Sequence, residues 1–150
     1  LELFPAVALN TVNNFITYIE DALYAGSTFH RVIANFMVQG GIVKETKNPI
    51  SGDFNLNGFE NNLKHSRGVI SMARTSDNNS ATSQFFIVHQ DSPHLDGKYA
   101  SFGGMISGFS VLDEIASVRT VNDKPVKDIV IEKVEISLNG YERNEVVYYN

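Results

Sequence analysis

Arg31 and Gln39 are the residues whose types and spacing first suggest chemistry in this sequence. They belong to two short runs, residues 28–33 and 36–39, which are rich in aromatic and β-branched side chains and predict neighbouring strands joined by a tight turn. If Arg31 and Gln39 project from the same surface as Phe36, a guanidinium group lies beside an apolar patch, a combination that a plain core strand should avoid. The stretch therefore predicts a site that pairs a cationic hydrogen-bond donor with an apolar surface.

Residues 29–41 contain Phe-His-Arg followed closely by Phe-Met-Val-Gln-Gly-Gly, and this order resembles the signature of the cyclophilin family of peptidyl-prolyl isomerases. Further motifs of that family follow at the right distances. They are Gly-Val-Ile-Ser-Met-Ala-Arg at 68–74, Ser-Gln-Phe-Phe-Ile at 83–87, Leu-Asp-Gly-Lys at 95–98 and Phe-Gly at 102–103. The ordered matches cover most of the chain, from about residue 1 to residue 136.

The resemblance assigns roles to individual residues. Arg31 stands at the catalytic arginine position of the family, and Phe36 and Gln39 complete the expected catalytic set. The positions expected to bind substrate are His30, Met37, Ala73, Arg74, Gln84, Phe86, His94, Leu95 and Tyr99. The more ordinary alternatives are a surface salt bridge for Arg31 and core packing for the apolar members. Core packing is the role expected of Phe85, whose side chain should point away from that of Phe86 in a strand.

The reaction implied by the resemblance is rotation about the peptide bond that precedes proline. Resonance gives this bond a rotation barrier of about 18 to 20 kcal/mol, and unaided exchange takes roughly 10 to 100 seconds. Exchange within about a millisecond requires a barrier that is lower by roughly 5 to 7 kcal/mol, with no bond made or broken. In the twisted state the proline nitrogen becomes a hydrogen-bond acceptor, which a cationic donor such as Arg31 can stabilise in a water-poor groove. This mechanism requires no cofactor.

Three positions depart from the patterns best known in the family. His94 stands where eukaryotic members carry a tryptophan that contacts the immunosuppressant cyclosporin, and Tyr99 stands where they carry a histidine. Because an imidazole offers less apolar contact than an indole, the resemblance implies weak cyclosporin binding with isomerase activity retained. Arg74 replaces an asparagine that is common in the family, so we expect a more basic groove rim.

Metal, nucleotide and hydrolase sites are not predicted. The four histidines, His30, His65, His89 and His94, match no common ligand spacing, and isolated histidines more often pack or lie on the surface. The Gly-Gly pairs at 40–41 and 103–104 lack the pattern that surrounds a phosphate-binding loop or a nucleophile elbow.

Two helices are predicted to support the site. Apolar residues recur at helical spacing over residues 12–23, with Asn10 or Thr11 able to cap the start and Gly26 placed to end the run. A second, shorter helix is predicted just after Ser110, where the spacing of Ser and Asp suits a capping box.

The rest of the chain predicts short strands and long loops. Residues 42–64 and 75–82 are polar and rich in turn formers, and the resemblance implies that the second of these loops borders the substrate groove. Strand-like runs occupy residues 68–74, 84–89, 99–106 and 129–136. Many strands with two helices indicate a mainly β fold. The resemblance selects a closed antiparallel eight-stranded barrel of cyclophilin type, capped by two α-helices, with its first strand missing from the chain.

The expected domain organisation is a cyclophilin-like isomerase domain over residues 1–137 and a C-terminal extension over 138–150. Asn139-Gly140 favours a two-residue hairpin turn, and residues 145–149 are β-prone, so the extension is a candidate strand for the vacant place in the barrel. The register about that turn sets Arg143 opposite Ile136, which opposes this interpretation. A disordered extension is the alternative.

Composition and charge limit the partners. The 150 residues suit one domain, and 43% hydrophobic and 19% charged residues are typical of a globular protein without a membrane-spanning segment. The net charge of -5 would repel a phosphate backbone and an anionic membrane surface, so neither nucleic acid nor a membrane is an expected partner. The absence of cysteine is compatible with a reducing compartment. A cytoplasmic monomer is therefore the default expectation.

The leading hypothesis is a peptidyl-prolyl cis-trans isomerase that acts on Xaa-Pro bonds in proline-containing peptides and in unfolded or folding proteins. The alternative is a chaperone or scaffold module that grips proline-containing segments without significant turnover. A lipocalin-type ligand barrel is a third class, and it would need an apolar barrel interior in place of an external groove.

Overall fold

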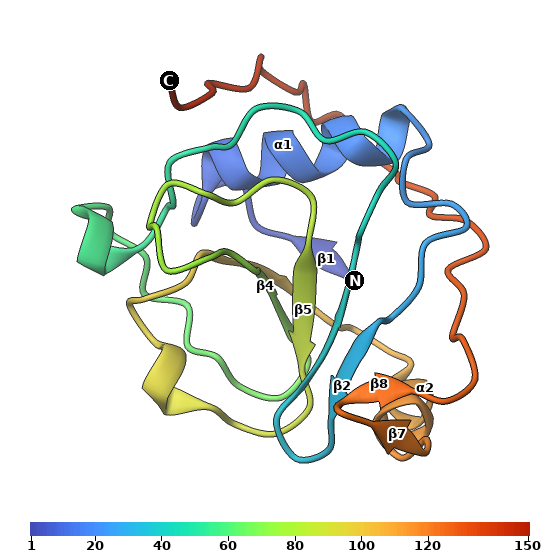
Figure 1. The fold of residues 1–150 in the computed structure, drawn as a ribbon. Helices are drawn as coiled ribbons and strands as arrows, with labels where there is room; N and C mark the ends of the chain where they lie inside the picture. Colours follow the sequence, from blue (N-terminus) through green and yellow to red (C-terminus); the bar gives the residue numbers. More distant parts are fainter.

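The computed structural model describes all 150 residues and shows two helices and eight short strands (Figure 1). The helices are α1 (Leu9–Glu20) and α2 (Phe109–Ala116). The strands are β1 (Glu2–Leu3), β2 (Arg31–Ile33), β3 (Met37–Gly40), β4 (Val69–Met72), β5 (Phe85–Val88), β6 (Ser101–Gly104), β7 (Thr120–Val121) and β8 (Lys124–Pro125). Single turns of 3-10 helix occur at Asn55–Asn57 and Pro93–Leu95. The fold is mainly β, as the sequence predicts.

Six strands form one antiparallel sheet in the order β1-β6-β4-β5-β3-β2. β2 and β3 are the hairpin expected from the first motif, and Arg31 lies opposite Gln39 in their register. β7 and β8 form a separate two-stranded sheet. In Figure 1, this small sheet and α2 lie together at the end of the main sheet opposite α1.

The expectation of a closed eight-stranded barrel is wrong, because hydrogen bonds do not run round the sheet. β1 and β2 are its two edges, and they are not paired with each other. Of residues 129–136, predicted as a last strand, only 129–131 pair, through an isolated bridge between Val130 and Thr28 and backbone hydrogen bonds with Gly26, Ser27 and Phe29. Residues 132–137 make no backbone hydrogen bonds at all. A barrel needs every strand to have two neighbours, and β1 has a strand on one side only.

An apolar cleft of about 680 Å³ opens where closure would occur. Leu1 and Leu3 line one side of the cleft, and residues 129–137 line the other. Phe15 and Phe85, both buried, also line this space.

α1 is the amphipathic helix predicted from periodicity, and its apolar stripe is buried. Its boundary differs from the prediction, because the helix begins at Leu9 after Ala8, and no side chain caps it. Asn10 and Thr11 are inside the helix and bond elsewhere: Asn10 to the backbone of Val147, and Thr11 to the buried carboxylate of Asp53. The helix ends at Glu20, well before Gly26. Neither helix has the length and apolar character needed to cross a bilayer.

The sheet has two differently used faces, because successive side chains in a strand point to opposite sides. On one face Val38, Ile70 and Phe85 pack with α1 in the main core. On the other face Met37 and Phe86 belong to a smaller apolar cluster. The prediction that the side chains of Phe85 and Phe86 point to opposite faces of the sheet is confirmed. The second face is the one that carries the expected site.

Residues 138–150 form no strand and lie along α1. The Tyr141 hydroxyl donates to Asn13 Oδ1 at 2.6 Å, and the Val147 N–H donates to Asn10 Oδ1 at 2.9 Å. Figure 1 shows this segment, in dark red, beside α1 and away from β1. The extension therefore does not fill the place between β1 and residues 129–137.

Candidate active site

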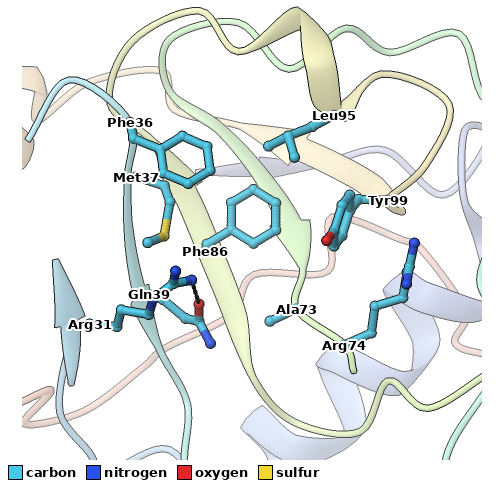
Figure 2. A pocket seen from close by; sticks show the side chains of 9 residues that line it. All are labelled: Arg31, Phe36, Met37, Gln39, Ala73, Arg74, Phe86, Leu95 and Tyr99. Carbon is cyan, nitrogen blue, oxygen red and sulfur yellow. Dashed lines mark hydrogen bonds between the residues drawn. The ribbon is translucent and has the colours of Figure 1, made fainter. Parts of the chain in front are cut away.

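Nine of the twelve residues expected at the site line one pocket of about 130 Å³ (Figure 2). They are Arg31, Phe36, Met37, Gln39, Ala73, Arg74, Phe86, Leu95 and Tyr99. The strand register brings three of them together, since Arg31 on β2 lies opposite Gln39 on β3, and Gln39 lies opposite Phe86 on β5. No residue outside the expected set lines this pocket.

Arg31 is exposed and has no carboxylate partner, so the salt-bridge alternative for it is wrong. Its Nη1 donates to Gln39 Oε1 at 3.3 Å, and Gln39 Nε2 in turn donates to Gln84 Oε1 at 3.0 Å. A guanidinium carries five N–H donors, so most of those on Arg31 remain free. The glutamine pair orients the guanidinium at the edge of the pocket without neutralising its charge.

The apolar floor of the pocket is formed by Met37, Phe86 and Leu95, which are 2%, 5% and 7% exposed. The Tyr99 ring meets Phe86 edge to face, with ring centroids 5.9 Å apart. Phe36 is half-buried at the rim, and Figure 2 shows its ring on the side opposite Tyr99. A floor that is closed below and open above suits a small apolar ring, and the free donors of Arg31 lie beside it.

The Phe86 ring is supported from behind by a buried histidine. His65 stacks on Phe86 with an interplanar angle of 18° and a centroid distance of 6.0 Å. The His65 N–H and Nδ1 contact Asp96 Oδ1 at 2.7 and 3.1 Å, and its Nε2 lies 2.9 Å from Ser71 Oγ. Burial lowers the pKa of His65 despite the carboxylate of Asp96, so the ring is neutral near pH 7.

The chain of contacts from Ser71 through His65 to Asp96 resembles the arrangement of a Ser-His-Asp nucleophilic triad. Ser71 is 0% exposed and His65 is 1% exposed, so no substrate carbonyl can reach the hydroxyl. The three residues therefore act as a rigid support for Phe86. Sequence reasoning missed this role for His65, because nothing local to residue 65 signals a partner at residue 96.

Arg74 is held at the rim of the pocket beside Tyr99. Its guanidinium carbon lies 4.4 Å from the ring centroid of Tyr99 and 5.1 Å from that of Phe54. Nη2 donates to the Lys98 carbonyl at 2.6 Å, and Nη1 donates to the Thr75 carbonyl at 2.9 Å. Its partners are rings and carbonyls, so the rim carries an uncompensated positive charge as expected.

Three expected site residues lie outside the main pocket. His94 is exposed, and its ring centroid is 5.4 Å from that of Phe36. Gln84 lines a neighbouring cavity of about 300 Å³. His30 is half-buried, its Nδ1 has no hydrogen-bond partner, and burial lowers its pKa.

The neighbouring cavity also includes residues that were not named from the sequence. They are Thr75, Ser80 and Thr82, from the polar loop expected to border the groove. The loop is braced internally, since Ser80 Oγ accepts from the Thr75 N–H at 2.9 Å. No cluster of three or more His, Cys, Asp and Glu side chains is placed to hold a metal ion.

Comparison with known proteins agrees with the geometry of the pocket. A family described as cyclophilin type peptidyl-prolyl cis-trans isomerase/CLD matches residues 1–136. Peptidyl-prolyl cis-trans isomerase A of Dickeya dadantii is 43% identical over 137 residues, which cover 84% of this chain and 72% of that protein. Peptidyl-prolyl cis-trans isomerase B of Escherichia coli is 37% identical over 156 residues, covering 91% and 92%.

A solved structure shows the same similarity at the level of the fold. The cyclophilin type isomerase of Cryptosporidium parvum, crystallised in the presence of the dipeptide Ala-Pro, superposes with a TM-score of 0.79 and 29% identity. The match covers 88% of this chain and 87% of that one. The chain therefore belongs to the cyclophilin family of peptidyl-prolyl cis-trans isomerases.

Proposed function

We propose that Arg31 is the electrostatic catalyst of the isomerase and that the Met37, Phe86 and Leu95 floor holds the proline ring. The observation that carries this proposal is a guanidinium without an ion-pair partner at the edge of an apolar pocket. Gln39 and Gln84 hold the donor in place, and Phe36 and Tyr99 flank the ring. The backbone of Ala73 and Arg74 lies along the bound peptide.

The physical basis is preferential binding of the twisted amide. In the planar ground state the proline nitrogen shares its lone pair with the carbonyl and accepts no hydrogen bond. As the bond twists, the lone pair localises on nitrogen and accepts from Arg31. Because this bond exists only in the transition state, it accelerates rotation without tightening substrate binding. A charged donor in a fixed position is worth several kcal/mol in such a site, which is the scale required.

We propose that the substrates are proline-containing segments of unfolded or folding proteins, bound by a monomer. The pocket shares Gln39, Ala73 and Arg74 with the neighbouring cavity that Gln84 lines, which leaves room beside the proline ring for an extended segment. The relative crystallised with Ala-Pro supports a proline residue as the recognised element.

Replacing Arg31 with alanine tests the mechanism. We expect kcat/KM to fall about 100-fold or more, with peptide affinity within about threefold of the wild type, because the lost bond is made only in the transition state. Both are measured by NMR exchange and titration on a short Ala-Pro peptide. Arg143→Ala is the control, since Arg143 pairs with Glu20 on the exposed side of α1 and should not change either value.

The same experiment separates the enzyme from a binding module. Wild-type protein that binds the peptide without accelerating exchange would support a chaperone or scaffold role. Exchange that survives in Arg31→Ala contradicts the proposed mechanism.

We also propose that this protein binds cyclosporin weakly and that His94 is the reason. The exposed imidazole beside Phe36 offers a small, polar contact surface where an indole would add apolar area. We expect His94→Trp to bind cyclosporin about tenfold or more tightly, with catalytic efficiency within about threefold of the wild type. Inhibition measured in the isomerase assay checks this. An unchanged inhibition constant in the variant contradicts the proposal.

A further inference from the structure

His89 is a polar residue near the active-site groove that the mechanism above does not use. It directly follows β5, and its backbone N–H donates to the Phe36 carbonyl at 2.8 Å. Its side chain is 15% exposed. Its ring nitrogens contact two different elements, the turn between β2 and β3 on one side and α2 on the other.

The hydrogen bonds fix the tautomer of the His89 ring. The backbone N–H of Asn35 donates to Nδ1 at 2.9 Å, so Nδ1 carries no hydrogen. The hydrogen of the neutral ring is then on Nε2, which lies 3.0 Å from Asp113 Oδ1 and donates to it. The ring therefore joins the carboxylate on α2 to one particular amide of the turn.

Asp113 is itself held by a second cation. Arg67 donates to both of its carboxylate oxygens, at 2.8 and 3.0 Å, and to the His89 carbonyl at 3.1 Å. The guanidinium of Arg67 and the ring of His89 hold the pKa of Asp113 below its usual range, so the carboxylate stays ionised. The Arg67 guanidinium also lies 5.3 Å from the ring centroid of Phe109 at the start of α2. The acceptor for His89 is therefore fixed to the fold at several points.

The turn that His89 contacts is strained and carries a pocket residue. Asn35 has a φ of +65°, the left-handed region that few non-glycine residues occupy. The next residue is Phe36, whose ring lines the proline pocket and whose N–H closes the turn onto the Ile33 carbonyl at 3.0 Å. A change at Asn35 alters the direction in which Phe36 leaves the turn.

We propose that His89, in the tautomer set by Asp113, is a positioning residue that clamps the β2–β3 turn and thereby aims Phe36 into the proline pocket. The inference rests on the proposed function in one respect, the contact between Phe36 and the substrate. His89 itself lines no part of the pocket. It acts through the Asn35 amide.

A set of three substitutions at residue 89 tests the clamp. In His89→Asn the side-chain oxygen occupies the place of Nδ1 and accepts from the Asn35 amide. In His89→Gln the amide group reaches toward Asp113, in the place of Nε2, and leaves the Asn35 N–H without its acceptor. His89→Ala removes both bonds.

We expect His89→Asn to keep kcat/KM within about twofold of the wild type, and the Gln and Ala variants to lose about fivefold to tenfold, because small misplacements of a substrate-positioning group are costly. Hydrogen exchange at the Asn35 amide should accelerate in the Gln and Ala variants and stay slow in the Asn variant. Thermal unfolding of all three verifies that they are folded. A purely structural role predicts that Gln, which fills more of the space of an imidazole, is tolerated at least as well as Asn.

Two results overturn the proposal. One is equal kcat/KM in all three variants. The other is a loss of kcat/KM in His89→Asn as large as the loss in His89→Ala. Failure of the Arg31 mechanism is recognised separately, because Arg31→Ala leaves the Asn35 amide bond intact and should not change its exchange rate.

Discussion

At the scale of single residues, the arginines show how partners decide function. Arg67 and Arg143 are held by carboxylates, and Arg74 lies between two rings with its donors on carbonyls. Arg31 has only a neutral amide oxygen at 3.3 Å. A guanidinium neutralised by a carboxylate has less to offer a developing lone pair. Of these four, only Arg31 combines largely free donors with a place at the apolar pocket, and the fifth arginine, Arg119, does not line the pocket.

His65 carries a prediction about pH at the same scale. Its pKa in the folded protein is below the value of about 6.5 expected for an unfolded chain. The unfolded state then binds more protons than the folded state between these two values, so stability falls as pH falls below about 6.5. The effect is limited to about 1.4 kcal/mol per pH unit for one group.

We expect the free energy of unfolding to decrease more between pH 7.5 and pH 5.5 in the wild type than in His65→Gln. Urea unfolding at both pH values measures the two differences. His30, whose pKa is also lowered by burial, contributes in the same direction in both proteins and so cancels in the comparison. Equal pH dependence in wild type and variant would mean that His65 is not the titrating group.

At the scale of elements, the C-terminal extension has a different role from the one its sequence suggests. Asn139 and Gly140 both adopt positive φ, so the predicted turn does form. The chain then leaves along α1, where Val146 and Tyr148 pack against the main core. The Tyr149 N–H donates to the Pro49 carbonyl at 2.7 Å. The extension covers the helix and does not extend the sheet.

Deleting residues 142–150 should therefore cost about 1 to 2 kcal/mol of unfolding free energy. This is the amount expected for two half-buried apolar side chains and a few exposed hydrogen bonds. Catalysis should be unchanged, since the extension does not line the pocket. Urea unfolding of the truncated protein measures the loss, with Arg143→Ala as the control that should change stability by less than about 0.5 kcal/mol. A loss below about 0.5 kcal/mol in the truncated protein would contradict packing of the extension on α1.

At the scale of the whole molecule, the two faces of the main sheet have different roles. One face carries the main core against α1, and the other face carries the smaller cluster that forms the floor of the pocket. Neighbouring residues in one strand thus have different duties, as Phe85 and Phe86 do. The sheet is open between β1 and residues 129–137, and the cleft there includes Phe85 and Ile87 of β5, whereas the pocket includes Phe86 on the other face of the same strand. The pocket is therefore formed although the sheet is not closed.

The sequence by itself determined the family, the reaction and the residues of the pocket. The residues that line the pocket come largely from short segments, 31–39, 73–74 and 95–99, so their types are readable as motifs. The alternation of side chains along a strand was enough to separate Phe85 from Phe86. The helix of residues 9–20 was also predicted from local periodicity, although its start was not, because no cap residue marks it.

The tertiary structure alone decided features that depend on residues distant in the chain. His65, which stacks on Phe86, is bonded to Asp96, 31 residues away, and the Asn35 amide is bonded to His89, 54 residues away. Closure of the sheet depends on whether its two edge strands pair. The sequence pattern of a strand does not reveal this, because the pattern is the same whether or not the strand has a neighbour. A local pattern specifies what a segment buries, whereas its partner is chosen by the packing of the whole chain. That is why the pocket residues were predictable, and why the open sheet, the path of the extension and the two histidine contacts were not.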